Sequence, residues 1–297
     1  MSTAPGESLG ETVDPVDIVV FPGQGSQRAG MGGELFDRYP DLVAQADDVL
    51  GYSVRALCSD DSDGRLDRTE FTQPALYVVN ALHYAAHLES APPPRIVLGH
   101  SLGEYNALHA AEVFDFATGL RLVAARAGAM SAIDGGAMAA VVGLDADTIG
   151  YTLGAARLTG LDIANLNTPQ QVVLSGPVDE LAAATDPLVA AGAKMVRPLR
   201  VSGPFHSRYM TPARMKLTEA LAATDFHPPR RTVLANATAR PYEPDTIGTL
   251  LAMQIDHPVR WGESCYPLLA APGVHLTEMY SNTLTRMFAQ MRRNFER

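Results

Sequence analysis

Ser101 lies at the centre of GHSLG, residues 99–103, which fits the pattern Gly-x-Ser-x-Gly. An apolar run precedes it at 95–98, and a helical pattern begins near Leu102, the strand-to-helix context in which this pattern presents a nucleophile. Glycines two residues before and after the serine would let the backbones of such a tight turn pass closely. The turn would project Ser101 Oγ at a helix N-terminus, where the dipole and free N–H groups favour negative charge. The segment therefore predicts a nucleophilic serine.

A serine nucleophile needs a base, and the chain has eight histidines. His100 adjoins the serine, but consecutive side chains on such a turn point apart. His206 lies in VSGPFHSRYM, where Gly203-Pro204 predicts a turn out of a strand. A histidine presented by such a loop is a plausible base, and we expect it to be His206.

A second loop follows an apolar strand in IVVFPGQGSQRAGMG, residues 18–32. A dinucleotide fingerprint would need its third glycine at Arg28, and the Gly-Lys-Ser/Thr of a P-loop occurs nowhere in the chain. The glycines therefore serve chemistry other than phosphate binding.

Composition limits the class of protein. The 297 residues are 46% hydrophobic and carry a net charge of −10, which argues against nucleic acid or an anionic membrane as partner. Cys58 and Cys265 have no metal-type spacing, and no metal site is expected. The acidic N-terminus resembles no targeting peptide, and no apolar run approaches the ~20 residues of a membrane span. We expect a monomeric cytoplasmic protein.

Hydrophobic periodicity predicts the order of the elements. Strands are expected at 17–21, 95–98, 137–143, within 161–175 around the turn NLNTPQQ, at 194–199, at 232–238 and at 274–278. Helices are expected within 33–57, at 73–88, from about 102, at 116–130, 145–158 and 178–191, and between the last three strands. Residues 58–70 are expected to be a charged loop.

The strand-helix-strand-strand-helix-strand order after Gly135-Gly136 is the ferredoxin-like pattern. We therefore predict an α/β fold with a large α/β-hydrolase-like domain and an inserted small ferredoxin-like domain. The expected limits are a disordered tail at 1–14, the large domain at 15–134 and 199–297, and the small domain at 135–198.

Three motifs together resemble the malonyl-CoA:acyl carrier protein transacylase family: PGQGSQ at 22–27, GHSLGEY at 99–105 and GPFHS at 203–207. The likeness extends through LVAARAGAM around Arg126, NLNTPQQVVLSG at 165–176, and Gln254 to PVRW at 258–261. It covers the chain from Asp17 to about Leu284. The motifs look most like the discrete acyltransferases that serve polyketide synthases in trans.

The resemblance implies roles for the matching residues. Ser101 would attack the thioester of malonyl-CoA with His206 as base, and the phosphopantetheine thiol of an acyl carrier protein would then take the malonyl group. The backbone amides of Gln24 and Leu102 would form the oxyanion hole. A backbone carbonyl near Gln254 would orient His206. Substrate-binding residues by the same likeness are Asn165, Asn167 and Gln254. No permanently bound cofactor is implied.

Arg126 fits a malonyl substrate independently, since a free carboxylate needs a bidentate cationic partner. It lies among apolar or small residues, and a buried arginine needs an anion. Phe205, next to the histidine, is expected to flank the α-carbon of the malonyl group and to exclude an α-methyl branch.

The chain departs from the family pattern at two places. EMYSNTLTRM, 278–287, stands where the family has a Gly-Pro-Gly loop, and Lys194-Met195 stands where it often has Lys-Arg.

Other functions remain open at this point. An acyl hydrolase that clears carrier proteins could use the same scaffold, although a buried Arg126 would gain it nothing with neutral acyl chains. An esterase could use Ser101, an aspartate and His275, but without a ferredoxin-like insert. A non-enzymatic binding module would make the three motifs coincidental.

Overall fold

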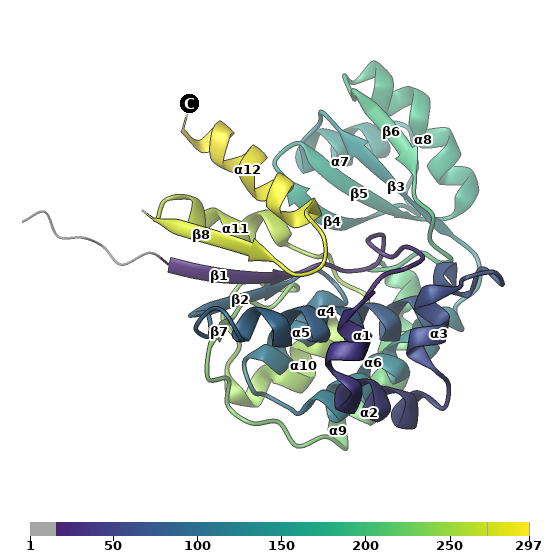
Figure 1. Cartoon of the computed structure of the whole chain (residues 1–297). Helices are drawn as coiled ribbons and strands as arrows, with labels where there is room; N and C mark the ends of the chain where they lie inside the picture. Colours follow the sequence, from purple (N-terminus) through teal and green to yellow (C-terminus); the bar gives the residue numbers. More distant parts are fainter. Residues whose placement is uncertain (1–15, 272, 297) are drawn as a thin grey trace, which may run out of the picture.

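The computed structural model describes residues 16–271 and 273–296, and its strands form two separate sheets (Figure 1). One sheet is parallel and belongs to the larger part of the chain. The other is antiparallel and is built from a single continuous segment. In the described part of the chain, no helix is both long and apolar enough to cross a membrane. The tail expected at 1–14 lies outside the described residues.

The parallel sheet has the strand order β7-β2-β1-β8, from β1 (Val16–Phe21), β2 (Ile96–Gly99), β7 (Thr232–Val233) and β8 (Val274–Glu278). Strands β1 and β2 pair in register, with Phe21 opposite Gly99. Because the carboxyl ends of parallel neighbours meet at one edge, the loop after β1 and the turn after β2 leave the sheet side by side. The pairing thus brings together the two glycine-rich motifs of the sequence.

Helices cover both faces of this sheet, because successive side chains of a strand point to opposite faces. Val19 and Phe21 belong to the main hydrophobic cluster with helices α4 and α6, whereas Ile18 and Val20 pack with Trp261 and the helices α11 and α12. The helices of the larger part are α1 (Leu35–Arg38), α2 (Pro40–Leu50), α3 (Val54–Ser59), α4 (Thr69–Leu88), α5 (Gly103–Ala110), α6 (Phe116–Ser131), α9 (Thr211–Ala222), α10 (Ile247–Met253), α11 (Trp261–Leu269) and α12 (Thr283–Phe295), with 3-10 turns at Arg65–Asp67, Arg208–Met210 and Pro244–Thr246.

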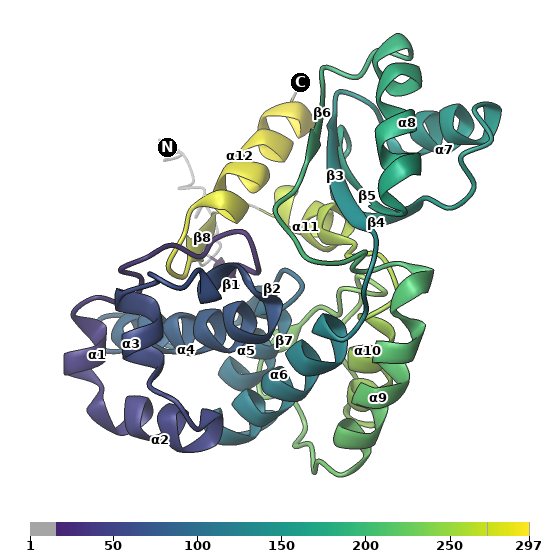
Figure 2. The ribbon, with the colours of Figure 1, turned by 90° about the vertical axis from the view of Figure 1, so that its right-hand side faces the viewer.

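The antiparallel sheet has the strand order β4-β5-β3-β6. Its elements follow the chain as β3 (Ala137–Val142), α7 (Ala146–Ala155), β4 (Asp162–Thr168), β5 (Gln171–Gly176), α8 (Val178–Ala190) and β6 (Met195–Pro198). This order and connectivity are ferredoxin-like. The chain enters the sheet after α6 and leaves it along the segment that leads to α9 (Figure 2). The predicted fold class is therefore confirmed, while the limits 135–198 of a small domain stay a prediction.

Three local expectations were wrong, and one helix was missed. The loop expected at 58–70 contains the end of α3, the 3-10 turn Arg65–Asp67 and the start of α4. The asparagines of NLNTPQQ lie in strand β4, and the turn is shorter than predicted. The strand expected at 232–238 ends at Val233, because the backbone turns there and Leu234 bridges to Pro241. Helix α12 was not predicted, although Leu284, Phe288 and Met291 lie at helical spacing against the second hydrophobic cluster.

Close backbone packing between β1, β2 and α5 makes a stability prediction possible. A Cβ on Gly103 would lie 2.0 Å from the Phe21 carbonyl oxygen, whereas a Cβ on Gly128 of α6 would meet nothing within 4 Å. We expect Gly103→Ala to lower the free energy of unfolding by about 3 kcal/mol or more, since backbone atoms cannot rotate away from the overlap. Gly128→Ala should raise it by up to about 1 kcal/mol through helix propensity. Denaturant titration measures both, and equal stabilities for the two variants would contradict this packing.

Candidate active site

Ser101 occupies a sharp turn between β2 and α5, with a φ of 52° that non-glycine residues rarely adopt. A Cβ on Gly99 would lie 2.0 Å from the Gly103 carbonyl, so the turn closes only with glycine at its first position. The local sequence thus forces the strained serine backbone, as in the elbow that exposes a nucleophile. The close backbone approach expected at Gly99 and Gly103 is therefore confirmed.

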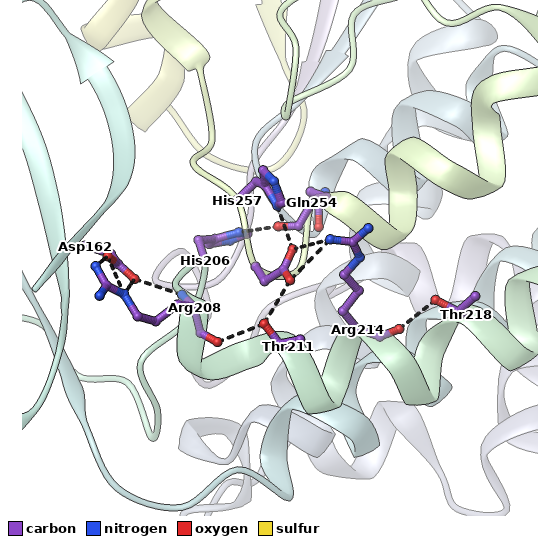
Figure 3. A network of polar contacts seen from close by, with 9 residues as sticks. Asp162, His206, Arg208, Thr211, Arg214, Thr218, Gln254 and His257 are labelled. Atoms are coloured by element: carbon purple, nitrogen blue, oxygen red, sulfur yellow. Dashed lines mark hydrogen bonds and ion pairs between the residues drawn. The ribbon is translucent and has the colours of Figure 1, made fainter. Parts of the chain in front are cut away.

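His206 lies against this serine, with its Nε2 2.7 Å from Ser101 Oγ. The backbone of His206 also has a positive φ, 58°, which aims the ring out of the turn that Gly203-Pro204 begins. Its Nδ1–H donates to the carbonyl oxygen of Gln254 at 2.7 Å (Figure 3). This bond fixes the tautomer, so Nε2 is left to accept the Ser101 proton.

The environment keeps this imidazole neutral. Burial and, to a smaller extent, the positive charge of Arg126 lower the pKa of His206 to about 3, although the hydrogen bond to the Gln254 carbonyl opposes the shift. A neutral histidine in contact with a hydroxyl is able to act as a general base at physiological pH.

Arg126, on α6, is 1% exposed and reaches the same serine. Its Nη2 lies 3.0 Å from Ser101 Oγ and 2.8 Å from Gln254 Oε1, and its Nη1 donates to Gln73 Oε1 at 2.6 Å. Within the described residues, Nε has no hydrogen-bond partner and the guanidinium has no carboxylate within 4.0 Å. Arg126 is therefore a buried cation held by neutral groups.

Gln254 forms hydrogen bonds with Ser101, His206 and Arg126 and so connects them. Its backbone carbonyl accepts from His206, its Oε1 accepts from Arg126, and its Nε2 donates to the Ser101 carbonyl at 2.8 Å and to Glu104. The side chain is 0% exposed. These contacts orient the site, and a contact between Gln254 and the substrate stays a prediction.

Asn236 holds the serine turn in place, although no sequence motif marks this residue. Its Oδ1 accepts from the Ser101 amide at 2.7 Å, its Nδ2 donates to the Gly99 carbonyl at 2.7 Å, and its own amide donates to Glu104 Oε1 at 2.8 Å. Asn236 reaches the serine turn because β7 ends early, at Val233. The only possible signal in the sequence was therefore an early end to the strand expected at 232–238.

The loop after β1 lies directly on the serine turn. A Cβ on Gly23 would be 2.5 Å from the His100 carbonyl oxygen and 3.6 Å from the Leu102 amide nitrogen. Among the described residues, neither the Gln24 amide nor the Leu102 amide donates a hydrogen bond to a protein acceptor. Two free amides next to the nucleophile are the donors that an oxyanion hole requires.

The remaining predicted residues lie around this centre. Asn167 Oδ1 accepts from His100 Nε2 at 2.8 Å and so connects β4 to the serine turn, and Asn165 is 5% exposed beside it on the same strand. Phe205 is also 5% exposed and packs in the main hydrophobic cluster, so its contact with an acyl α-carbon stays a prediction. His275 lies on the exposed start of β8 against Asp17, which removes it from any triad with Ser101.

Ion pairs flank His206 on the side of the antiparallel sheet. Arg208 pairs with Asp162 of β4, and Asp256 accepts from His257, Thr211 and Arg214 (Figure 3). A cavity of about 750 Å³ opens here, lined by α7, the start of β4, His206 and the segment after Gln254. The antiparallel part of the chain and two segments of the larger part, around His206 and after Gln254, therefore border the approach to His206.

Taken together, these groups can carry out acyl transfer through a serine ester. The nucleophile, a neutral base and two amide donors are present, and a buried cation lies where a charged acyl group would be held. The described residues contain no cluster of three or more histidine, cysteine or acidic side chains that could hold a metal ion.

Comparison with known proteins gives the same chemistry. A family model described as an acyl transferase domain matches residues 18–263. PksC of Bacillus subtilis, a polyketide biosynthesis malonyl CoA-acyl carrier protein transacylase, is 45% identical over 280 residues, covering 93% of this chain and 97% of that protein. These matches confirm the family resemblance of the motifs.

Solved structures agree with the fold. The chain is similar to a malonyl CoA-acyl carrier protein transacylase from Burkholderia pseudomallei, with a TM-score of 0.89, 48% identity and coverage of 94% of this chain and 98% of the other. It is also similar to a malonyl-transacylase in complex with a type II polyketide synthase acyl-carrier protein, with a TM-score of 0.87, 34% identity and 93% coverage of each chain.

The contacts of Asn236 lead to a prediction. Asn236→Ala leaves the Ser101 N–H and the Gly99 carbonyl without partners, and each unsatisfied buried group costs about 1–3 kcal/mol. We expect the free energy of unfolding to fall by about 2 kcal/mol or more, and Ser101 to react more slowly with a serine-directed fluorophosphonate. The exposed Asn294→Ala is the matched control. Labelling at the wild-type rate in both variants would show that Asn236 does not hold the turn.

Proposed function

Because the chain belongs to the acyl transferase domain family, we propose that it moves a malonyl group from malonyl-CoA, through an ester of Ser101, to the phosphopantetheine thiol of an acyl carrier protein in polyketide biosynthesis. The names of its relatives support both the malonyl donor and the carrier partner. The malonyl-CoA is a substrate, and the phosphopantetheine belongs to the partner. Neither chemical step needs a bound cofactor.

The observation that carries this proposal is the buried charge next to the nucleophile. Arg126 Nη2 lies 3.0 Å from Ser101 Oγ, and the guanidinium has no carboxylate partner among the described residues. A buried cation without an anion is costly, and malonyl carries a carboxylate at the end opposite its thioester. An acyl group on Ser101 that folds back on Arg126 supplies the missing anion. Neutral acyl groups would leave the charge uncompensated, which argues against an acyl hydrolase of neutral chains.

In the first half-reaction, Ser101 Oγ attacks the thioester carbonyl of malonyl-CoA while His206 Nε2 takes the serine proton. The amides of Gln24 and Leu102 stabilise the oxyanion of the tetrahedral intermediate. Its collapse breaks the carbon–sulfur bond, and His206 returns the proton to the leaving CoA thiolate. The Gln254 carbonyl keeps Nδ1–H of His206 in place and stabilises the imidazolium that forms during the step.

The second half-reaction runs the same machinery in reverse. His206 removes the proton of the phosphopantetheine thiol, whose sulfur attacks the ester carbonyl of malonyl-Ser101. The oxyanion is held by the same two amides, and the carbon–oxygen bond to Ser101 breaks as His206 returns the proton to Oγ. This is a ping-pong scheme, in which CoA leaves before the carrier protein binds.

We also propose that the enzyme acts as a monomer in the cytoplasm. The catalytic groups named above all come from one chain, so no second copy is needed to complete the site. Cys58 and Cys265 are free and buried, which suits a reducing compartment.

Loss of the nucleophile gives the first test of this function. Ser101→Ala should abolish covalent acylation, because the ester cannot form without Oγ. Intact-mass spectra after incubation with malonyl-CoA should show one malonyl adduct on the wild type and none on the variant. An adduct that persists on Ser101→Ala would place the acyl group elsewhere.

Arg126 should determine which acyl group is accepted. A charged hydrogen bond contributes about 1.5–3 kcal/mol, so we expect Arg126→Ala to lower the preference for malonyl-CoA over acetyl-CoA by at least about tenfold. Arg126→Lys keeps the charge without the planar fork and should lose less. Arg121→Ala, on the exposed side of the same helix, is the control. Equal losses for malonyl and acetyl transfer would mean that Arg126 is needed only for folding.

A further inference from the structure

Glu104 is a buried carboxylate to which the proposed mechanism gives no role. It is the second residue of α5, three residues after the nucleophile, and is 0% exposed. The N-terminal end of a helix favours a negative charge at this position. A buried carboxylate still needs hydrogen-bond donors on both oxygens.

Three donors converge on this carboxylate. The Asn236 amide and the Tyr242 hydroxyl donate to Oε1 at 2.8 and 2.7 Å, and Gln254 Nε2 donates to Oε2. Burial raises the pKa of Glu104 to about 7, and the hydrogen bonds from Tyr242, Asn236 and Gln254 oppose that shift. The charged form therefore predominates at pH 8.

Glu104 and the Ser101 carbonyl, which both accept from Gln254 Nε2, together determine which way the Gln254 amide points. A carboxylate only accepts, so the NH₂ group of Gln254 must face Glu104. The amide oxygen then faces Arg126, and it accepts from Nη2 at 2.8 Å. If the amide were turned round, its NH₂ group would face a guanidinium N–H, and two donors would oppose each other.

We propose, on the basis of the malonyl transfer proposed above, that Glu104 is a positioning residue for acyl selectivity. Through the oriented amide of Gln254, it holds the Arg126 guanidinium beside Ser101 so that the carboxylate of the acyl group can bind there. Glu104 acts through another residue and does not touch the substrate.

The separation of the two charges is part of this argument. Glu104 does not form an ion pair with Arg126 within 4.0 Å, because the Gln254 side chain lies between them. A carboxylate in direct contact would occupy the guanidinium and compete with the malonyl carboxylate. A carboxylate behind a neutral amide stabilises the buried cation and leaves the side of the guanidinium next to Ser101 without a carboxylate.

The test is acyl selectivity measured at pH 8 as the ratio of kcat/KM for malonyl-CoA and acetyl-CoA. Glu104→Gln places an amide where three donors meet, so the Gln254 amide should turn and Arg126 should lose its acceptor. We expect the malonyl preference to fall at least about fivefold, the factor that corresponds to one hydrogen bond of about 1 kcal/mol. Acetyl transfer should fall less than malonyl transfer.

Tyr242→Phe is the matched control. It removes one hydrogen bond from Glu104 but keeps the carboxylate and its contact with Gln254. The malonyl preference should stay within about twofold of wild type, even if the melting temperature falls. A loss of preference in Tyr242→Phe equal to that in Glu104→Gln would mean that both act through general destabilisation, and would overturn the proposal.

A double variant tests whether Glu104 acts through Gln254. In a Gln254→Ala background, which keeps the carbonyl that holds His206, Glu104→Gln should change selectivity by less than about twofold. If Glu104→Gln does not fold, Gln254→Ala alone decides the question. Wild-type selectivity in Gln254→Ala overturns the proposal, because no amide remains to be oriented.

A crystal structure separates this inference from the proposed function. If the Arg126 guanidinium in Glu104→Gln has moved away from Ser101 Oγ, the positioning role is supported, whatever acyl group the enzyme carries. A guanidinium that keeps its contacts with Ser101 and Gln254 overturns it, even if malonyl transfer is established. Absence of a malonyl adduct on the wild type would instead overturn the proposed function.

Discussion

The buried guanidinium of Arg126 is the constraint on which the rest of the site depends. A cation that is 1% exposed must be satisfied by its surroundings, and here those surroundings are Gln73, Gln254 and the nucleophile itself. Burial lowers the pKa of His206 most, and the positive charge of Arg126 adds to that shift, so the base stays neutral. In the proposed function the same charge has two effects, since it would bind the carboxylate of the acyl group and it disfavours protonation of the imidazole.

The parallel pairing of β1 and β2 provides the frame for this charge. The register that sets Phe21 opposite Gly99 brings the loop after β1 onto the serine turn, and Gly23 and Gly103 allow contact between the two backbones. A larger side chain at either position would push the Gln24 and Leu102 amides apart. Gly23 and Gly103 are thus explained by one close approach, whereas Gly99 is needed within the serine turn and Gly25 for its φ of 101°.

Gln254 shows how a single residue can couple the parts of such a site. Its main chain holds the base, one side-chain atom holds the cation, and another holds the serine carbonyl and Glu104. Glu104 and Asn236 then fix the turn on which Ser101 lies. Because every buried polar group in this network has a limited set of partners, a change at one position is transmitted to the others.

The local features could be predicted from the residues alone. Glycine spacing predicted the serine turn, periodicity predicted the fold class and the ferredoxin-like order, and the surroundings of Arg126 predicted a buried cation. How Glu104, Asn236 and Gln254 meet depends on the tertiary fold, since the hydrogen bonds from Asn236 and Gln254 to the serine turn and Glu104 span 132 to 153 residues of sequence. The tertiary fold also decided that Asn165 and Asn167 lie in a strand and that β7 stops early. Short-range patterns report which backbone conformations and faces a segment prefers. The partners of buried polar groups depend on which distant segments the fold brings together, and no local pattern contains that information.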